Sequence, residues 1–413
     1  MPEPRGRTTT GRSHGEHLRG VSRLVIEATK GITDLVEEAH REMGSGPDVL
    51  GRPLEAPLRT FTALTYGGVR AITGLVGASI DFAFARLASL LGESSPGPER
   101  EAVLAALNGV LGDHLQATGN PLAIEMRLRH EGRPLDMTKT ALGASFPEAS
   151  RKLLVFVHGS SMSDLAWTRK GQDHGAALAR DLGCSTVYLH YNTGLHVSTN
   201  GRAFAALLES LVEAWPVPVD ELTILAHSMG GLVSRSACDA AAAAGQRWLS
   251  KLRNLVFLGT PHHGAPYERA GNLVDLALGI SRYSAPFARL GQIRSAGVTD
   301  MRHGSVRDED WEGRDRFAYG ADRRRPMPLP AGVRCFAVAA NKAATEGGKP
   351  FSDGLVPVDS ALGRHAKLEM TLAFENEWVG SGMSHVDLLS RPEVYEISRR
   401  WLGAPVRSSA APR

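Results

Sequence analysis

One serine stands where a strand is expected to pass into a helix. The apolar run Leu222–Ala226 is typical of a buried strand, and the alanine-rich residues 232–244 predict a helix. Between them lies Ser228, with the small residues Ala226 and Gly230 two positions away on either side. A tight turn of this kind lifts the hydroxyl clear of the strand, at a helix N-terminus whose dipole favours developing negative charge. The pattern indicates a nucleophilic serine.

The segment Ala226-His-Ser-Met-Gly230 resembles the nucleophile elbow of α/β-hydrolase lipases, in the form with a first alanine that some bacterial lipases have. Gly259-Thr-Pro-His-His-Gly264 resembles a loop of lipases and of GPI inositol-deacylase-like hydrolases, which borders the active-site cleft. The resemblance covers about residues 121–402. It implies the α/β-hydrolase fold and acyl transfer to water, with no metal and no organic cofactor.

A second motif lies upstream. The apolar run Leu153–Val157 predicts a central strand, and the His158-Gly159 pair that follows it resembles the oxyanion loop of the same fold. The resemblance implies that the backbone N–H groups of Ser160 and Met229 face the oxygen of the tetrahedral intermediate. His158 and Gly159 are expected to shape this loop and to line the substrate site.

A serine needs a base, and the base needs a group that orients it. In α/β-hydrolases the acid follows the serine and precedes the histidine. Asp-Gly-Leu-Val-Pro at 353–357 resembles the acid loop of lipases, which makes Asp353 the expected acid and Asp359 its nearest rival. His385 falls in the loop where the catalytic histidine belongs, and His365 is expected at the surface.

Three further histidines and Asp387 lie near these motifs, and none of them is expected to be catalytic. His227 is expected to be structural, because its side chain should point away from that of Ser228. His262 and His263 are expected to be structural or substrate-lining. Asp387 occupies the place of a calcium ligand in some secreted lipases, but no matching upstream carboxylate is present, so no metal site is predicted.

Strands and helices alternate after residue 121, which predicts a mostly parallel sheet flanked by helices. Besides Leu153–Val157 and Leu222–Ala226, the expected strands are Leu122–Arg129, Thr186–Leu189, Leu255–Leu258, Val333–Ala339 and Leu368–Phe374. The expected helices are Arg202–Ala214, Leu232–Ala244 and Pro392–Trp401.

The chain is expected to have several parts. Residues 1–16 and 404–413 are predicted to be disordered, 17–118 to form a helical appendage, and 121–403 to form the catalytic domain, with a cap or lid insertion at 265–330. The appendage has helical patterns over 17–43, 58–91 and 98–117. The second is apolar enough that a buried or partner-facing helix, a membrane-surface helix and a membrane span all stay open, with the first favoured.

The amino-acid composition limits the classes of partner expected for this protein. The 47 basic and 44 acidic residues nearly cancel, which argues against a nucleic-acid-binding protein. The three cysteines have neither disulfide-framework nor metal-ligand spacing, and the polar N-terminus lacks the apolar run of a signal peptide. A cytoplasmic location is expected, while contact with a membrane or a protein through residues 17–118 stays open, as does the oligomeric state.

The sequence thus predicts a serine hydrolase that cleaves lipid-like or medium-chain carboxylic esters. The apolar stretch 273–290 favours an acyl site, and the charged residues 308–316 argue against a wholly apolar lid. Two alternatives stay open: an acyltransferase with the same three residues, and a non-catalytic hydrolase-like module that binds a lipid or a protein.

Overall fold

The computed structural model describes residues 97–169, 172–264, 295–314, 322, 324–343 and 351–404. Within these ranges, eight strands form one sheet and two short strands form a separate hairpin. The strands of the large sheet are β1 (Arg127–His130), β2 (Arg133–Pro134), β3 (Lys152–Val157), β6 (Ser185–His190), β7 (Glu221–His227), β8 (Leu252–Leu258), β9 (Arg334–Asn341) and β10 (Asn376–Ser381), and the hairpin consists of β4 (Thr168–Arg169) and β5 (Gln172–Asp173).

The large sheet has the order β10-β9-β8-β7-β3-β6-β1-β2. Neighbouring strands from β10 to β6 are parallel, whereas β1 pairs antiparallel with both β6 and β2. Since the parallel strands share one direction, their carboxyl ends meet at one edge of the sheet. The predicted α/β architecture with a mostly parallel sheet is confirmed.

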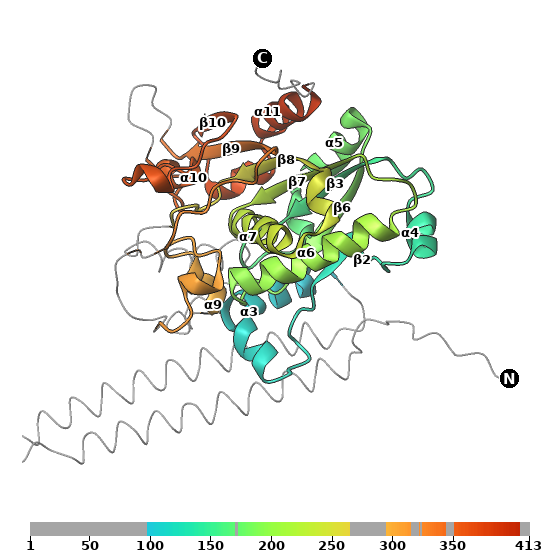
Figure 1. The fold of residues 1–413 in the computed structure, drawn as a ribbon, viewed down its shortest axis with the longest axis horizontal. Helices are drawn as coiled ribbons and strands as arrows, with labels where there is room; N and C mark the ends of the chain where they lie inside the picture. The colour runs from blue at the N-terminus through green and yellow to red at the C-terminus, as the bar shows by residue number, and fades with distance from the viewer. Residues whose placement is uncertain are drawn as a thin grey trace, which may run out of the picture.

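Helices cover both faces of the sheet (Figure 1). Alternate residues of β3 point to opposite faces, so Leu153 and Val155 join one buried cluster while Leu154 and Phe156 join another. The first cluster includes residues of α6 and α7, and the second includes residues of α5 and α11. The α-helices are α3 (Pro98–Ala117), α4 (Lys139–Ser145), α5 (His174–Leu182), α6 (Val197–Ala214), α7 (Met229–Ala244), α9 (Ala296–Asp300), α10 (Val358–Ala361) and α11 (Pro392–Gly403), and short 3-10 turns lie at η1 (Asp164–Trp167), η2 (Arg247–Lys251), η4 (Asp308–Asp310), η5 (Leu368–Met370) and η6 (His385–Leu389).

Two predicted strands need correction. The strand expected at Leu368–Phe374 is instead the turn η5 followed by a segment that belongs to no strand, and Leu368 is 86% exposed. The last strand is the more polar β10, which pairs with β9 on one side only. The strand expected at Leu122–Arg129 is confined to β1 at its end, and β2 lies outside β1 in the sheet.

Helix α3 packs on the rest of the described chain, although it belongs to the stretch predicted as an appendage. Asn108, which is fully buried, donates from Nδ2 to the carbonyl oxygens of Leu104 and Leu122, and its Oδ1 accepts from Ile124 N at 2.9 Å. These bonds fasten α3 to the segment that leads into β1. The helices expected over 17–43 and 58–91 lie outside the described residues, and no described helix has the length and apolar character needed to cross a membrane.

The predicted insertion 265–330 is described only from residue 295, and the apolar stretch 273–290 lies outside the described residues. The part that follows is tied to the start of α6. Asp300 is buried and accepts from Val197 N at 2.8 Å and from His196 Nδ1 at 3.0 Å, and the His196 ring stacks on Trp311 at 3.6 Å. Asp308 accepts from the Ser198 hydroxyl at 2.6 Å, so this charged segment is hydrogen-bonded to α6.

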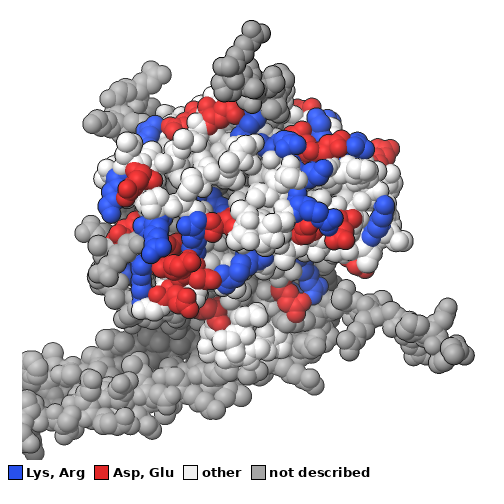
Figure 2. All heavy atoms as spheres, viewed as in Figure 1, with Lys and Arg blue, Asp and Glu red and all other residues white. Residues whose placement is uncertain are grey.

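Basic and acidic side chains are interspersed over the face of the molecule in Figure 2. Neither sign forms a large continuous patch on the described part of that face. This distribution matches the near balance of charges in the sequence.

Candidate active site

Ser228 occupies the turn between β7 and α7 with backbone angles φ 53° and ψ −126°. A positive φ is strained for a residue with a Cβ, at a cost of order 1–3 kcal/mol, so the surroundings must enforce it. The Ser228 N–H donates to Leu258 O at 2.8 Å, and Ser228 O accepts from Gly231 N at 3.0 Å. A Cβ on Gly230 would lie only 2.5 Å from Val157 O. The predicted need for a small residue at 230 therefore has a direct steric cause.

Asp353 and His385 are brought together from segments 32 residues apart. The distance from His385 Nδ1 to Asp353 Oδ2 is 2.6 Å, and both side chains are buried. Asp353 Oδ1 accepts from the backbone N–H groups of Leu355 and Val356, each at 2.8 Å. Because both carboxylate oxygens accept hydrogen bonds, Nδ1 of His385 carries the proton, and Nε2 is left as an acceptor.

His385 lies beside the Ser228 turn. His227, the residue before Ser228, donates from Nε2 to His385 O at 3.2 Å, and the two rings lie 4.7 Å apart. A Cβ on Gly259, next to the Leu258 carbonyl that binds Ser228, would lie 3.1 Å from the His385 ring. In the described chain no hydrogen bond joins Ser228 Oγ to His385. Such bonds commonly tighten only in the complex with substrate.

The loop after β3 lies against the same turn. A Cβ on Gly159 would lie 3.0 Å from Ser228 Cβ and 2.9 Å from His227 Nδ1, so only glycine fits at 159. Ser160 and Met229, the expected oxyanion residues, are buried in this loop and at the first position of α7. The first N–H groups of a helix have no partner inside it, so the N–H of Met229 can bind an anionic oxygen.

Helix α3 presses on the oxyanion loop, which the sequence did not predict. A Cβ on Gly109 would lie 1.9 Å from Ser161 Oγ and 3.0 Å from Ser161 Cα. Ser161 has φ 58° and donates from its N–H to Thr193 Oγ1 at 3.0 Å. A Cβ on Gly112 would lie 1.8 Å from Asn192 Oδ1, and Asn192 donates from Nδ2 to Gly112 O. The two glycines, three positions apart, are the sequence signal for this close packing.

His158 is fully buried at the end of β3, stacked 4.5 Å from the Tyr191 ring. Burial is the main cause that lowers its pKa to about 3, and charge repulsion from His190 and Arg129 acts in the same direction. The side chain is therefore neutral near pH 7 and supports the loop from within, while its carbonyl accepts from the Tyr191 hydroxyl at 2.9 Å. Burial lowers the pKa of five other histidines as well: His174, His227, His262, His263 and His303.

The pKa of His158 predicts a pH-dependent stability. In the unfolded chain the imidazole binds a proton below about pH 6.5. The folded chain binds none there until about pH 3, so acid favours unfolding, and the stability present above pH 6.5 is lost as the pH falls. From pH 7.5 to 5.5, His158 alone should lower the free energy of unfolding by about 1.4 kcal/mol.

Urea denaturation of the wild type and of His158→Leu at the two pH values measures this contribution. The variant should lose about 1.4 kcal/mol less than the wild type between pH 7.5 and 5.5. The exposed His114 provides the control, since His114→Gln should keep the wild-type difference. An identical loss in the wild type and His158→Leu would show that His158 takes up its proton in the folded state.

His262 and His263 lie in the loop after β8 and are held by arginines. The buried His262 ring packs 4.7 Å from Phe257, and Arg324 donates from Nη1 to His262 O at 3.0 Å. His263 donates from Nε2 to Gly363 O at 3.0 Å, and its Nδ1 lies 3.3 Å from Arg324 Nη2. These contacts fix the positions of both histidines, and the His262 side chain is fully buried.

The rival residues lie elsewhere. Asp359 is exposed and pairs with Arg364, and His365 is half-buried beside His263 at a ring distance of 4.8 Å. Asp387 accepts from the Ser384 hydroxyl at 2.6 Å and so caps the turn η6. Within the described ranges, no group of three or more His, Cys, Asp or Glu side chains is arranged to hold a metal ion.

The strand order and the position of Ser228 together decide the fold class. An antiparallel pair at one edge precedes the parallel strands, and Ser228 follows β7, the fifth strand of the large sheet in chain order. The loop after β3 approaches that serine, as in the hydrolase sheet. The chain has the α/β-hydrolase fold.

Residues 128–302 match a family model described as a domain of unknown function, DUF7379. The sequence comparison with curated proteins gave no match. Among solved structures, this chain is similar to the mature Bacillus licheniformis lipase BlEst2, with 17% identity over 67% of this chain and 98% of that one, at a TM-score of 0.41. It is also similar to Aspergillus fumigatus lipase B, with 10% identity over 66% of this chain and 58% of that one, at a TM-score of 0.40.

Proposed function

We propose that the protein is a serine hydrolase of carboxylic esters, with Ser228 as nucleophile, His385 as base and Asp353 as the residue that orients the base. The observation that carries this proposal is the buried Asp353–His385 pair, bonded at 2.6 Å beside the strained Ser228 turn. A carboxylate that fixes the Nδ1–H tautomer leaves Nε2 able to take the serine proton. The backbone N–H groups of Ser160 and Met229 would bind the oxyanion.

The reaction then follows from these groups. His385 Nε2 takes the proton of the Ser228 hydroxyl as Oγ attacks the ester carbonyl carbon. The tetrahedral intermediate expels the alcohol, which receives that proton from His385, and an acyl group stays on Ser228. Water attacks the acyl carbon and gives a proton to His385, the bond to Oγ breaks, and Ser228 regains the proton as the acid leaves.

The proposed substrates are lipid-like or medium-chain esters. Hydrolysis of p-nitrophenyl esters from acetate to palmitate by the full-length protein tests this, with the expectation that kcat/KM is highest at intermediate chain length. An added short alcohol separates the two acyl-transfer outcomes, because a hydrolase should release mainly the free acid. Failure to turn over any ester of the series would overturn the proposed function.

The packing of α3 predicts an effect on this activity. In Gly109→Ala, the new methyl group would displace Ser161 and, with it, the neighbouring Ser160 N–H. Displacement of a catalytic donor by a fraction of an ångström should lower kcat roughly tenfold to a hundredfold, with a smaller effect on KM. Steady-state kinetics with one p-nitrophenyl ester measures both constants.

The matched control is Gly97→Ala at the start of the same helix. A Cβ there would meet nothing within 4 Å, and φ is −128°, so kcat should stay at the wild-type value. Wild-type kcat in Gly109→Ala would show that α3 does not position the oxyanion loop, whatever the fate of the nucleophile assignment.

A further inference from the structure

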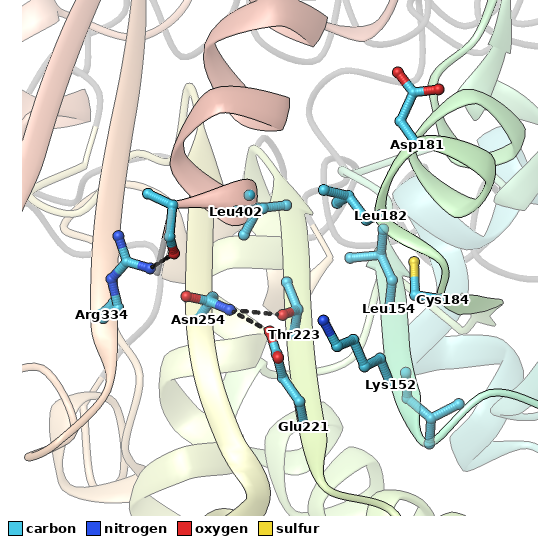
Figure 3. A pocket seen from close by; sticks show the side chains of 13 residues that line it. Lys152, Leu154, Asp181, Leu182, Cys184, Glu221, Thr223, Asn254, Arg334 and Leu402 are labelled. Carbon is cyan, nitrogen blue, oxygen red and sulfur yellow. Dashed lines mark hydrogen bonds between the residues drawn. The ribbon is translucent and has the colours of Figure 1, made fainter. Parts of the chain in front are cut away.

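A cavity of about 340 Å³, drawn in Figure 3, opens at one edge of the sheet. It lies at the amino ends of β3, β7, β8 and β9, and Leu402 and Gly403 of α11 close one side. Glu221 and Ser228 stand at opposite ends of β7, roughly 20 Å apart at the rise of an extended strand. The cavity is therefore separate from the candidate active site, and its volume falls in the range of small-molecule sites.

The lining joins an apolar part to a polar part. Leu154, Leu182 and Leu402 supply the apolar part, and Glu221 and Asn254 supply the polar part (Figure 3). An amphipathic lining of this kind orients a ligand by its polar end while apolar contacts supply affinity.

Asn254 is 1% exposed, and only the nitrogen of its side-chain amide has hydrogen-bond partners. Its Nδ2 donates to Glu221 Oε1 and to Thr223 Oγ1, both at 3.0 Å, whereas Oδ1 accepts no hydrogen bond. A buried acceptor without a donor costs roughly 1–3 kcal/mol. A ligand that brings a hydroxyl or N–H group to Oδ1 would recover this free energy.

Glu221 supplies negative charge to the cavity. Its carboxylate accepts from Asn254 and forms no ion pair with any described residue. The other charged groups of the wall are mostly engaged: Arg334 binds Glu375 and the Ala404 carbonyl, and Asp181 accepts from Tyr395. Lys152 is an exposed residue that also lines the cavity, and its side chain points toward Thr223 and Glu221 in Figure 3.

Cys184 also lines the cavity, and its thiol lies close enough to Glu221 to be affected by the charge of that carboxylate. Burial and the charge of Glu221 raise the pKa of its thiol to about 11, and the opposing effect of Lys152 is smaller. A carboxylate at this position would attract a cationic ligand and repel an anionic one.

We propose that this cavity is a second ligand site that takes a small amino alcohol with an apolar chain. The ammonium group would bind the Glu221 carboxylate, the hydroxyl would donate to Asn254 Oδ1, and the chain would pack on Leu154, Leu182 and Leu402. The proposal is independent of the reaction at Ser228.

Leucinol, which has a primary amine, a hydroxyl and an isobutyl chain, is the probe. Isothermal titration calorimetry of the full-length protein should show saturable binding of leucinol. Isopentylamine, which lacks the hydroxyl, should bind at least threefold more weakly, and 4-methylpentanoate at least tenfold more weakly. Glu221→Gln should weaken leucinol binding at least tenfold, while ester hydrolysis stays at the wild-type level.

Two further measurements test the proposal even if Glu221→Gln fails to fold. Lys152→Met, at an exposed position, should bind leucinol at least as tightly as the wild type, because a competing positive charge is removed. Leucinol should also protect Cys184 from iodoacetamide at pH 9, whereas Cys238 and Cys335 are buried. The proposal is overturned if leucinol does not bind saturably, if 4-methylpentanoate binds as tightly, or if Lys152→Met abolishes leucinol binding.

Discussion

Ser228→Ala is expected to lower kcat for p-nitrophenyl ester hydrolysis by roughly 10⁴-fold or more, because no other group can form the acyl-enzyme. The Ser228 hydroxyl forms no hydrogen bond with any described residue, so its removal leaves no partner unsatisfied. The free energy of unfolding should therefore change by less than about 1 kcal/mol. Steady-state kinetics and urea denaturation measure the two quantities.

The substitution Ser228→Gly separates the loss of the nucleophile from the release of backbone strain at this turn. Ser228→Gly should be as inactive as Ser228→Ala but more stable by about 1 kcal/mol, because glycine adopts φ 53° without a Cβ penalty. Turnover by either variant above a few per cent of the wild-type rate would mean that another residue is the nucleophile. Equal stability of the two variants would mean that the turn stores no strain.

Asp353→Asn is expected to lower kcat by roughly 10³- to 10⁴-fold, through the tautomer of His385. Asp353 Oδ1 must remain an acceptor, since the N–H groups of Leu355 and Val356 both donate to it. In the variant the amide NH₂ would therefore face His385 Nδ1, which would have to accept. The imidazole proton would move to Nε2, and the ring could no longer take the proton of Ser228.

Asp353→Asn should also change the NMR spectrum of His385. In ¹⁵N NMR spectra of histidine-labelled protein, the protonated nitrogen of His385 should shift from Nδ1 in the wild type to Nε2 in Asp353→Asn. Asp359→Asn is the matched control, because Asp359 is exposed and paired with Arg364, and it should keep both the rate and the tautomer. A low rate in Asp353→Asn without a tautomer change would assign the loss to misfolding of the acid loop.

The elements that the sequence predicted well are those with strong local signals. Helix α3 begins at Pro98 and ends at Ala117 as expected, since proline at the first turn and a breaker before it mark its start. The turn at Ser228 was predicted because the small residues that it needs lie only two positions away in the sequence. The pairing of Asp353 with His385 was expected only through the resemblance to lipases, because spacing along the chain does not encode a contact across 32 residues.

The failures have an equally physical origin. Leu368–Phe374 contains enough apolar residues for a strand, yet Leu368 is exposed, and β10 was missed because an edge strand needs few buried side chains. The contact between Gly109 and Ser161 is a close approach of two distant segments. A pair of glycines in a helix indicates such an approach without naming its partner.

The most direct test of the central claim is the position of a covalent label. After reaction of the full-length protein with a fluorophosphonate, peptide mass spectrometry should find one phosphonylated residue, Ser228, and His385→Ala should react at least a hundredfold more slowly. A label on Ser160, Ser161 or any other residue, or no label on active protein, would contradict the assignment of Ser228 as the nucleophile.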